Sequence, residues 1–533
     1  MPMKAIAATI LTLLLTHAAF ATPADEAAKE GILLLGNGSE PHSLDPHINS
    51  SMNGHHVIMT LLEGLIAPSP TDDTIPLPGM AESWENEDFT KWTFKIRQNA
   101  KWSNGDPVTA HDFVYSFQRI LSPRLGSQYA EMLFNLKNAR AFNEGEISDF
   151  SEVGTKAIDN HTLTIELEGP IPYFLNILKH SSFFPVHKAT VEKYGDMDDP
   201  TNNWIREEYV GNGPYVLKNW QMNQIIEVAK SPTYWDSKDV LLNGIKFFPI
   251  ASENTEDQTF NSGNLHYTYT VPSDMIQVYQ DRNDKTLHLD PFFGTYFYVL
   301  NNKVPPLDNP KVRQALSLAV NRNAIVRRIT KGGQTPAEFF TPPGVAGYSP
   351  EPLVSFNPAK ARELLAEAGY PNGEGFPTLT IKFNTLESHK AIAEAIQQMW
   401  KKILGIDVDI RNQEWKVYIN SMQEGDFQIA RYAWIGDYLH PDTFLRIMQS
   451  DSGQNDASYS NPEYDRLIAQ SFIENSDEKR LELLAEAEKI LLTDMPVIPI
   501  YHYTRVYRID PRVKGWHSSP LDIRNYKGIY FEN

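Results

Sequence analysis

The sequence predicts an α/β protein with several domains. In its second half, strand-like segments such as Leu379–Phe383 and Val408–Ile410 alternate with segments whose apolar residues recur at helical spacing, Lys390–Ile403 and Lys479–Leu492. This alternation is typical of a sheet that is covered by helices. Of the 533 residues, 41% are hydrophobic and 11% aromatic, so the chain can build sizeable cores. At ~150 residues each, it is long enough for about three domains.

The first residues have the features of a secretory signal peptide. Lys4 precedes an apolar run from Ala5 to Leu15, and Ala19-Phe-Ala21 fits the small-x-small cleavage pattern. A membrane anchor is the alternative, but the run is short for a span and His17 interrupts it. We therefore expect cleavage of residues 1–21. We expect the mature protein to be soluble, because no other stretch approaches about 18 uninterrupted apolar residues.

The absence of cysteine and the acidic charge exclude several classes of function. Without cysteine the chain has no disulfide, no thiolate metal site, no cysteine nucleophile and no lipid-modified cysteine at the cleavage site. The formal net charge is −19, and it becomes −20 without Lys4 of the leader. The electrostatic field of this negative net charge repels nucleic acid and anionic lipid. No basic cluster offsets it, so nucleic acid is not an expected partner.

Two histidine-containing clusters could suggest a metal site, namely His55-His56 and Asp437 to His440. Neither offers the three or four ligands that a protein-bound metal needs. We expect these histidines to be exposed or to cap helices. The sequence predicts no metal and no cofactor.

Local patterns predict further elements. Apolar residues that alternate with polar ones indicate a half-buried strand, and capping residues or a first-turn proline indicate helix starts. On these signals we expect a helix at 59–66 that ends near Gly64, a strand at 92–97, a helix that starts after Thr109, a strand at 294–302 and a helix at 309–320.

The stretch Ile429–Tyr438 combines a strand-like apolar run with two charges, Arg431 and Asp437. A charge buried alone costs far more than a hydrogen bond returns, so each needs a partner. One interpretation is an internal ion pair between the two, with Trp434 in the core. The other is a cleft that leaves one cation and one anion for the two ends of a zwitterionic ligand. Taken alone, the stretch favours the ion pair, since charged residues in an apolar stretch also occur as ion pairs with a purely structural role.

Several blocks carry a resemblance that covers essentially the whole mature chain. They are Gly38-Ser-Glu-Pro-His-Ser-Leu-Asp-Pro-His47, Glu63-Gly-Leu65, Trp102–Ser116 and Gly211-Asn-Gly-Pro-Tyr215. In these blocks the chain resembles the large peptide-type solute-binding proteins of ABC importers. The resemblance implies an α/β fold of the type II periplasmic binding protein class, with two lobes joined by a hinge and an additional inserted domain.

The resemblance also implies domain boundaries. Lobe I is expected to combine discontinuous segments, because the chain crosses the hinge twice, near Phe293 and Arg505. The expected ranges are 1–21 for the signal peptide, 22–63, 189–293 and 505–533 for lobe I, 64–188 for the inserted domain, and 294–504 for lobe II.

In this family the ligand is an extended peptide held between the lobes, with backbone groups supplying much of the affinity. Its amino group meets a carboxylate in a Trp-x-x-Asp stretch, here Trp434-Ile-Gly436-Asp437. Its carboxylate can meet an arginine that matches Arg431, or at another peptide length a histidine that matches His389. Matches to aromatic pocket residues are Tyr129, Trp415 and Tyr503. Ordinary core packing is the alternative role for each aromatic residue.

The chain departs from the family pattern at several implied pocket positions. A second family arginine, nine residues before Arg431, is replaced by Met422. The other replacements are Thr330 for a lysine, Ser50 and Val299 for acidic residues, and Gly294 and Ile435 for a cysteine pair. These changes remove charge of both signs. We therefore expect a preference for ligands with fewer basic side chains and a different length optimum.

The resemblance implies a periplasmic binding protein, expected to be monomeric, that captures short oligopeptides and delivers them to a membrane permease with its ATPase subunits. Alternatives with the same fold are binding of a cell-wall (murein) peptide, a dipeptide, haem or a nickel chelate. A secreted hydrolase is the alternative from another class. No His-Glu-x-x-His, Gly-x-Ser-x-Gly or Ser-x-x-Lys motif with supporting context appears, so we do not expect an enzyme.

Overall fold

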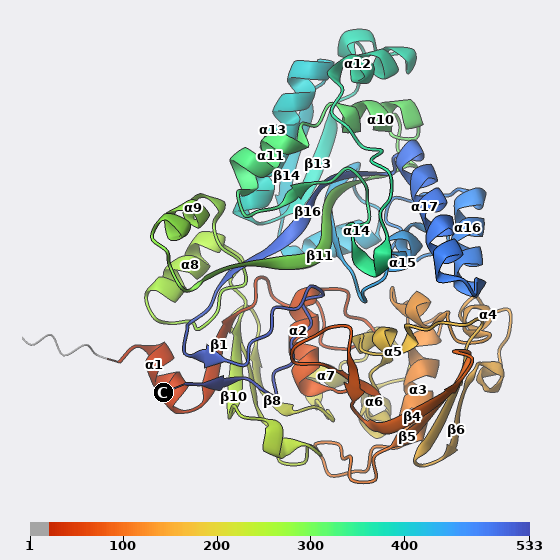
Figure 1. Cartoon of the computed structure of the whole chain (residues 1–533), viewed down its shortest axis with the longest axis vertical. Helices are drawn as coiled ribbons and strands as arrows, with labels where there is room; N and C mark the ends of the chain where they lie inside the picture. The colour runs from red at the N-terminus through yellow and green to blue at the C-terminus, as the bar shows by residue number, and fades with distance from the viewer. Residues whose placement is uncertain (1–20, 533) are drawn as a thin grey trace, which may run out of the picture.

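The computed structural model describes residues 21–532, so the predicted signal peptide lies almost entirely outside the described residues. Two halves are visible in Figure 1. The lower half contains two four-stranded sheets, with strand orders β1-β10-β9-β8 and β4-β5-β7-β6, and the upper half is built on a six-stranded sheet with the order β12-β16-β11-β15-β13-β14. Among residues 21–532, no helix is both long and apolar enough to cross a membrane.

The first sheet of the lower half joins segments far apart in sequence. Its strands are β1 (Ile32–Gly36), β10 (Gly244–Phe248), β9 (Ile225–Lys230) and β8 (Tyr215–Gln221), and only β1 and β10 run parallel. Helix α2 (Met52–Leu61) lies beside this sheet with almost every side chain buried. The predicted helix at 59–66 is therefore wrong in its bounds. The polar residues of α2 are buried and hydrogen-bonded by distant segments, so its helical spacing is not visible in the sequence.

The second sheet of the lower half lies within the range predicted for an inserted domain. It contains β4 (Ala81–Glu87), β5 (Lys91–Ile96), β7 (Thr162–Glu166) and β6 (Thr155–Asp159), all antiparallel. The predicted strand at 92–97 is confirmed as β5. The helix predicted to start after Thr109 is confirmed as α3 (Ala110–Leu121), where Thr109 and Asp112 form a reciprocal capping box.

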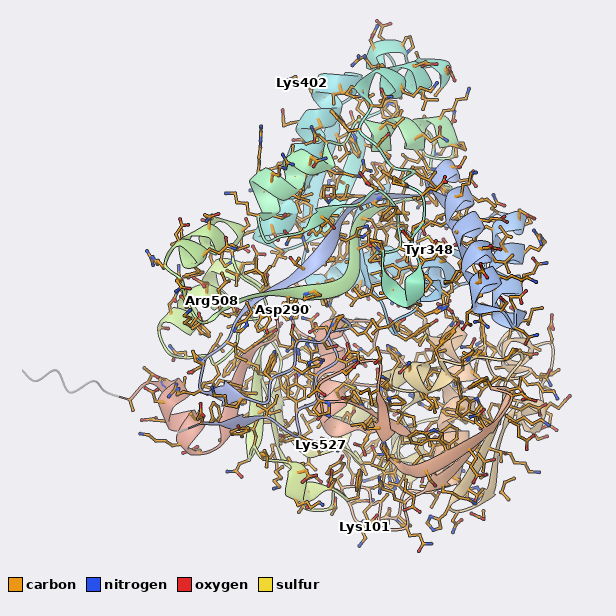
Figure 2. All side chains as sticks on the ribbon, in the orientation of Figure 1. Lys101, Asp290, Tyr348, Lys402, Arg508 and Lys527 are labelled. Atoms are coloured by element: carbon orange, nitrogen blue, oxygen red, sulfur yellow. The ribbon has the colours of Figure 1, made fainter. Side chains whose placement is uncertain are left out.

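The upper half is organised around two long strands, β11 (Leu287–Leu300) and β16 (Val497–Arg508). Both run out of the six-stranded sheet toward the lower half, and Figure 2 labels Asp290 and Arg508 on the stretch between the halves. Their register shifts between Pro291 and Thr295, which is beside the predicted hinge position Phe293. The strand predicted at 294–302 in fact begins earlier, at Leu287. The sequence does not indicate this part, because Asp290 and Pro291 are residue types that strands disfavour.

The remaining strands of the six-stranded sheet are β12 (Thr335–Pro336), β15 (Ile429–Ile435), β13 (Leu379–Asn384) and β14 (Val408–Gln413). Helices cover this sheet, as the sequence predicts: α10 (Pro310–Leu318), α12 (Pro358–Glu367), α13 (Glu387–Leu404), α16 (Pro462–Ile473) and α17 (Asp477–Asp494). The helix predicted at 309–320 is confirmed as α10, with Asn309 as its N-cap and proline in the first turn.

Shorter elements complete the described chain. They are α1 (Pro23–Lys29), α4 (Ala139–Asn143), α5 (Phe174–Ile177), α6 (Lys188–Tyr194), α7 (Trp204–Glu207), α8 (Glu253–Asn261), α9 (Ser273–Asp281), α11 (Arg322–Ile325), α14 (Trp415–Gln423), α15 (Asp442–Leu445), β2 (Ile66–Pro68), β3 (Pro76–Pro78), β17 (Val513–Lys514) and β18 (Tyr530–Phe531).

The expectation that His55 and His56 are exposed or cap helices is wrong, because both lie buried within α2. His55 Nδ1 is 3.1 Å from Ser181 Oγ, and His56 Nε2 is 3.0 Å from Asp522 Oδ2. Burial lowers the pKa of His55 to about 4 and that of His56 to about 3, so both are neutral. Within residues 21–532, no cluster of three or more potential ligands could hold a metal ion.

Candidate ligand-binding cleft

Two neighbouring cavities lie between the halves, with volumes of ≈ 110 Å³ and ≈ 280 Å³. The first cavity is the one that reaches Tyr129, His180 and Asp437, and the second is the one that reaches Thr330, His389 and Arg505. They share a wall made of Ser50 to Met52 from the lower half and Trp415, Arg431, Ala433 and Ile435 from the upper half. Because both halves contribute to both cavities, a ligand in this cleft would hold the halves together.

Strand β15 presents an open edge to the cleft. Its neighbour β13 pairs only with Ile429 and Ala430, so no strand of the described chain lies beside the edge from Arg431 onward. Gly436 N–H donates to Phe293 O on the opposite, β11 side, and the Arg431 carbonyl accepts from Tyr418 on the open side. Since backbone groups alternate along a strand, those of Ala433 and Ile435 face the cleft. This edge can pair with an extended peptide.

Asp437 lies at one end of the first cavity, and its side chain is only 8% exposed. Thr443 Oγ1 accepts from Asp437 N at 3.0 Å and lies 3.3 Å from the carboxylate. Burial raises the pKa of Asp437 to about 7. The one basic side chain within ion-pair distance in the described chain is His180, at 3.5 Å, and burial holds the His180 pKa well below its usual value. The carboxylate therefore has no cation of the described chain to balance it.

Arg431 lies in the wall shared by the two cavities, and it also has no counter-ion among the described residues. Its Nη2 donates to Tyr503 Oη at 2.8 Å, Nη1 is 3.4 Å from Asn384 Oδ1, and its guanidinium carbon lies 4.8 Å from the centre of the Tyr296 ring. Its Nε is buried without a hydrogen-bond partner in the described chain. No carboxylate between residues 21 and 532 is within ion-pair distance of Arg431, so the internal pair with Asp437 is ruled out.

The predicted aromatic residues surround the two charges. Beside Asp437, the Tyr129 ring stacks on Trp434 with ring centres 6.2 Å apart, and it lies tilted against His180 with ring centres 4.7 Å apart. Trp415 lines both cavities, and Tyr503 lines the second. Gly436 lines the first cavity where the chain passes close to Phe293, because a Cβ at this position would lie 2.5 Å from Phe293 Cδ1. A larger residue at position 436 would therefore displace either the ring or the strand.

Two other predicted residues have different surroundings. His389 lines the second cavity with Nδ1 3.5 Å from Tyr296 Oη, and burial holds its pKa well below the usual value. It is therefore neutral and offers a hydrogen bond rather than a charge. Met422 is a core residue, only 3% exposed, and lines neither cavity, which does not fit its predicted place among the ligand contacts.

The family replacements also take definite positions. Ser50 and Thr330 line the second cavity, whereas Val299 is buried in the core. Gly294 and Ile435 are direct partners across β11 and β15, and the Ile435 side chain occupies the space that a Cβ at position 294 would need. The isoleucine thus fills by packing the position where the resemblance implies a cysteine pair.

Sequence reasoning missed His180 and the strand partner Tyr418. His180 comes from the segment before α6 and reaches Asp437 only through the tertiary fold. No local pattern distinguishes it from other histidines. Tyr418 is an ordinary apolar position of α14 in the sequence, and its hydroxyl binds the open edge of β15 through folding alone.

Contacts beside the cleft hold the two halves in their present arrangement. Glu387, at the start of α13, accepts from Ser252 Oγ at 2.6 Å and from Glu253 N at 3.1 Å at the start of α8. In return, Ser388 Oγ donates to Glu253 at 2.9 Å. The carboxylate of one half therefore caps the helix of the other half.

Replacing Glu387 with alanine is expected to lower ligand affinity by about three- to tenfold, because about 1 kcal/mol of hydrogen bonding is lost in the closed arrangement only. Titration calorimetry measures the affinity, and small-angle scattering measures the closure. Glu394→Ala is the matched control, since Glu394 lies exposed on the same helix and pairs only with Lys390 at 3.8 Å. Equal affinities of the two variants would show that the contact does not stabilise closure.

Comparison with known proteins identifies relatives across the whole chain. The family model of bacterial extracellular solute-binding proteins, family 5 Middle, matches residues 76–456. The periplasmic oligopeptide-binding protein OppA of Salmonella typhimurium is 39% identical, with 98% of both chains covered. The structure of Haemophilus influenzae OppA in complex with the peptide RPPGFSPFR is 36% identical and superposes with a TM-score of 0.88, covering 94% of this chain and 99% of that one.

An open relative is less similar in shape. The unliganded open form of the murein tripeptide-binding protein MppA is also 36% identical, over 95% of this chain and 98% of that one, but its TM-score is 0.63. The described conformation is thus closer to a peptide complex than to an open form. The predicted fold class, with two lobes and an inserted domain, is confirmed by these neighbours. The chain belongs to the family 5 bacterial extracellular solute-binding proteins.

Proposed function

We propose that this chain binds short peptides in the cleft, with the peptide amino group at Asp437 and its carboxylate at Arg431. The observation that carries the proposal is a pair of charges of opposite sign along one open strand edge, the buried carboxylate of Asp437 and the partly buried guanidinium of Arg431, neither of which is balanced by a residue of the described chain. A zwitterionic ligand balances both charges and adds backbone hydrogen bonds at Ala433 and Ile435. Binding of this kind needs closure of the halves but no bond cleavage, so no catalytic role follows.

The spacing of the two charges suggests the ligand length. Asp437 follows Arg431 by six positions, which at ~3.3 Å per residue is about 20 Å, less the reach of the arginine side chain. A peptide of roughly three to five residues spans this distance when extended. A peptide that contacts both halves shifts the population toward the closed form. An ABC permease with its ATPases, in the periplasm, is the proposed recipient of the ligand.

Native mass spectrometry of protein purified without added ligand tests the proposal. A heterogeneous set of short peptide masses is expected, because the open strand edge and the two terminal contacts do not read side chains. One unique mass would contradict a general peptide binder, and the mass of a cell-wall peptide would identify murein peptide as the ligand, as the similarity to MppA allows. Incubation with a peptide library that yields new masses would reveal hydrolysis instead.

The cleft is expected to bind tri-alanine more tightly than tri-lysine, by about tenfold, because beyond Asp437, which the peptide amino group occupies, its described lining offers no free carboxylate for lysine side chains. Position 50, acidic in the family, is serine here, and the lining carboxyls Glu253 and Glu256 already bind donors of the protein. Calorimetry with matched alanine and lysine peptides of two to five residues gives the ratio. Ser50→Glu is expected to restore lysine binding, and equal affinities for both series would refute the preference.

A further inference from the structure

A cluster with excess positive charge lies beneath the second cavity. Arg505 Nη1 lies 3.4 Å from one oxygen of Asp522, and Arg524 Nη2 lies 3.3 Å from the other. The side chains of the two arginines and of Asp522 are at most 10% exposed. His56 also contacts Asp522 but is neutral, since burial lowers its pKa to about 3. Two buried guanidinium groups thus share one carboxylate.

Arg505 is the member of this cluster that reaches the ligand space. It lines the second cavity, and its guanidinium carbon lies 4.7 Å from the ring centre of Tyr269 and 5.5 Å from that of Phe292, which line the same cavity. Its Nη2 donates to Tyr267 Oη at 2.9 Å, whereas its Nε has no hydrogen-bond partner in the described chain. A guanidinium has five N–H donors, so Arg505 retains unused hydrogen-bonding capacity.

The other titratable groups of the second cavity do not balance Arg505. Glu256 accepts from the backbone N–H of Tyr269 at 2.9 Å and of Thr270 at 3.2 Å, and burial raises its pKa to about 8. Glu253 binds Ser388 across the cleft, and burial raises its pKa to about 7. His389 is neutral, and Arg431 adds a further positive charge. Near neutral pH the cavity therefore has cations in excess of its ionised carboxyl groups.

We propose that Arg505 is a specificity-determining residue that binds a carboxylate of the ligand in the second cavity. This inference rests on the proposed peptide-binding function and names the class of peptide, an acidic one. With Arg431 as the proposed partner of the peptide C-terminus, the carboxylate at Arg505 is that of an aspartate or glutamate side chain. The C-terminus presents the same planar acceptor to a guanidinium and is the other source that the test distinguishes. Either source supplies the charge that Asp522 alone does not.

Calorimetry with tetra-alanine peptides tests the inference, with glutamate or glutamine walked through each position and with free or amidated C-termini. At one position, glutamate is expected to bind about tenfold tighter than glutamine, and Arg505→Gln is expected to remove this difference while the glutamine peptides keep their affinity. If the C-terminus is the source, Arg505→Gln instead removes the preference for the free acid over the amide. The inference is overturned if neither preference depends on Arg505.

Two further variants distinguish binding of a carboxylate by Arg505 from a purely structural role. Arg505→Lys retains the charge and is expected to retain most of the preference, which a purely structural role of Arg505 does not predict. Thr330→Glu places a carboxylate in the same cavity with Arg505 intact, and it is expected to abolish the glutamate preference even if Arg505→Gln does not fold. Unsubstituted tetra-alanine distinguishes a failure of the proposed peptide-binding function from a failure of the inference about Arg505. If it does not bind, the proposed function fails, and if it binds without any acidic preference, only this inference fails.

Discussion

Replacing Asp437 with asparagine is expected to weaken peptides with a free amino terminus by roughly 2–5 kcal/mol, about 30- to 5,000-fold. The carboxylate is almost fully buried and has no cation of the described protein beside it, and the proposed function makes the ligand ammonium its partner. Asparagine retains the shape and the contact with Thr443 but loses the charge. Titration calorimetry with tri- to penta-alanine measures the loss.

N-acetylated peptides provide the control for Asp437. Acetylation removes the ammonium, so these peptides are expected to bind the wild type and Asp437→Asn about equally weakly. If Asp437→Asn weakens acetylated and free peptides to the same extent, the residue acts through the structure of the cavity and not through the amino terminus.

The pH dependence of binding follows from the same carboxyl group. Burial raises the pKa of Asp437 to about 7 in the ligand-free cleft, so below pH 7 it must lose a proton before it can hold an ammonium. Affinity is expected to fall about tenfold per pH unit below ~7, and to fall again above ~8, where the α-amino group of the peptide loses its proton. Because the folded pKa of Asp437 lies above the unfolded one, the ligand-free fold loses stability as the pH rises from about 4 to about 7. Bound ligand restores this stability. Asp437→Asn is expected to abolish the slope below ~7 in both affinity and stability.

Replacing Arg431 with methionine is the second change with a large expected effect. It is expected to lower affinity for free-acid peptides by roughly 2–5 kcal/mol, because the ligand carboxylate loses its guanidinium partner. The same variant is expected to stabilise the ligand-free protein, since it removes a partly buried cation that no carboxylate of the described chain balances. A higher melting temperature together with weaker binding is the combined signature.

C-terminally amidated peptides are the control for Arg431. They carry no terminal carboxylate, so wild type and Arg431→Met are expected to bind them within about threefold of each other. If the variant bound free-acid peptides with unchanged affinity, Arg431 would not bind the ligand carboxylate. Arg505 in the second cavity would then be the candidate partner.

Much of the secondary structure could be predicted because its signals are local. The capping residues Thr109 and Asn309 mark the starts of α3 and α10, and the alternation at 92–97 marks β5. Helix α2 could not be placed, since its buried histidines are stabilised by Ser181 and Asp522, far away in sequence. Local patterning fails where distant segments satisfy polar side chains.

By itself, the sequence determined that Arg431 and Asp437 lie on one strand-like stretch, that cysteine chemistry is absent, and that the chain resembles peptide-type binding proteins. Only the tertiary structure decided that the two charges do not pair with each other, because the open edge of β15 holds them apart beside the cleft. It also brought Arg505 and Arg524 onto a single carboxylate beneath the second cavity. Sequence specifies which charges a chain carries, whereas burial and the long-range pairing of strands determine which of them remain unbalanced for a ligand.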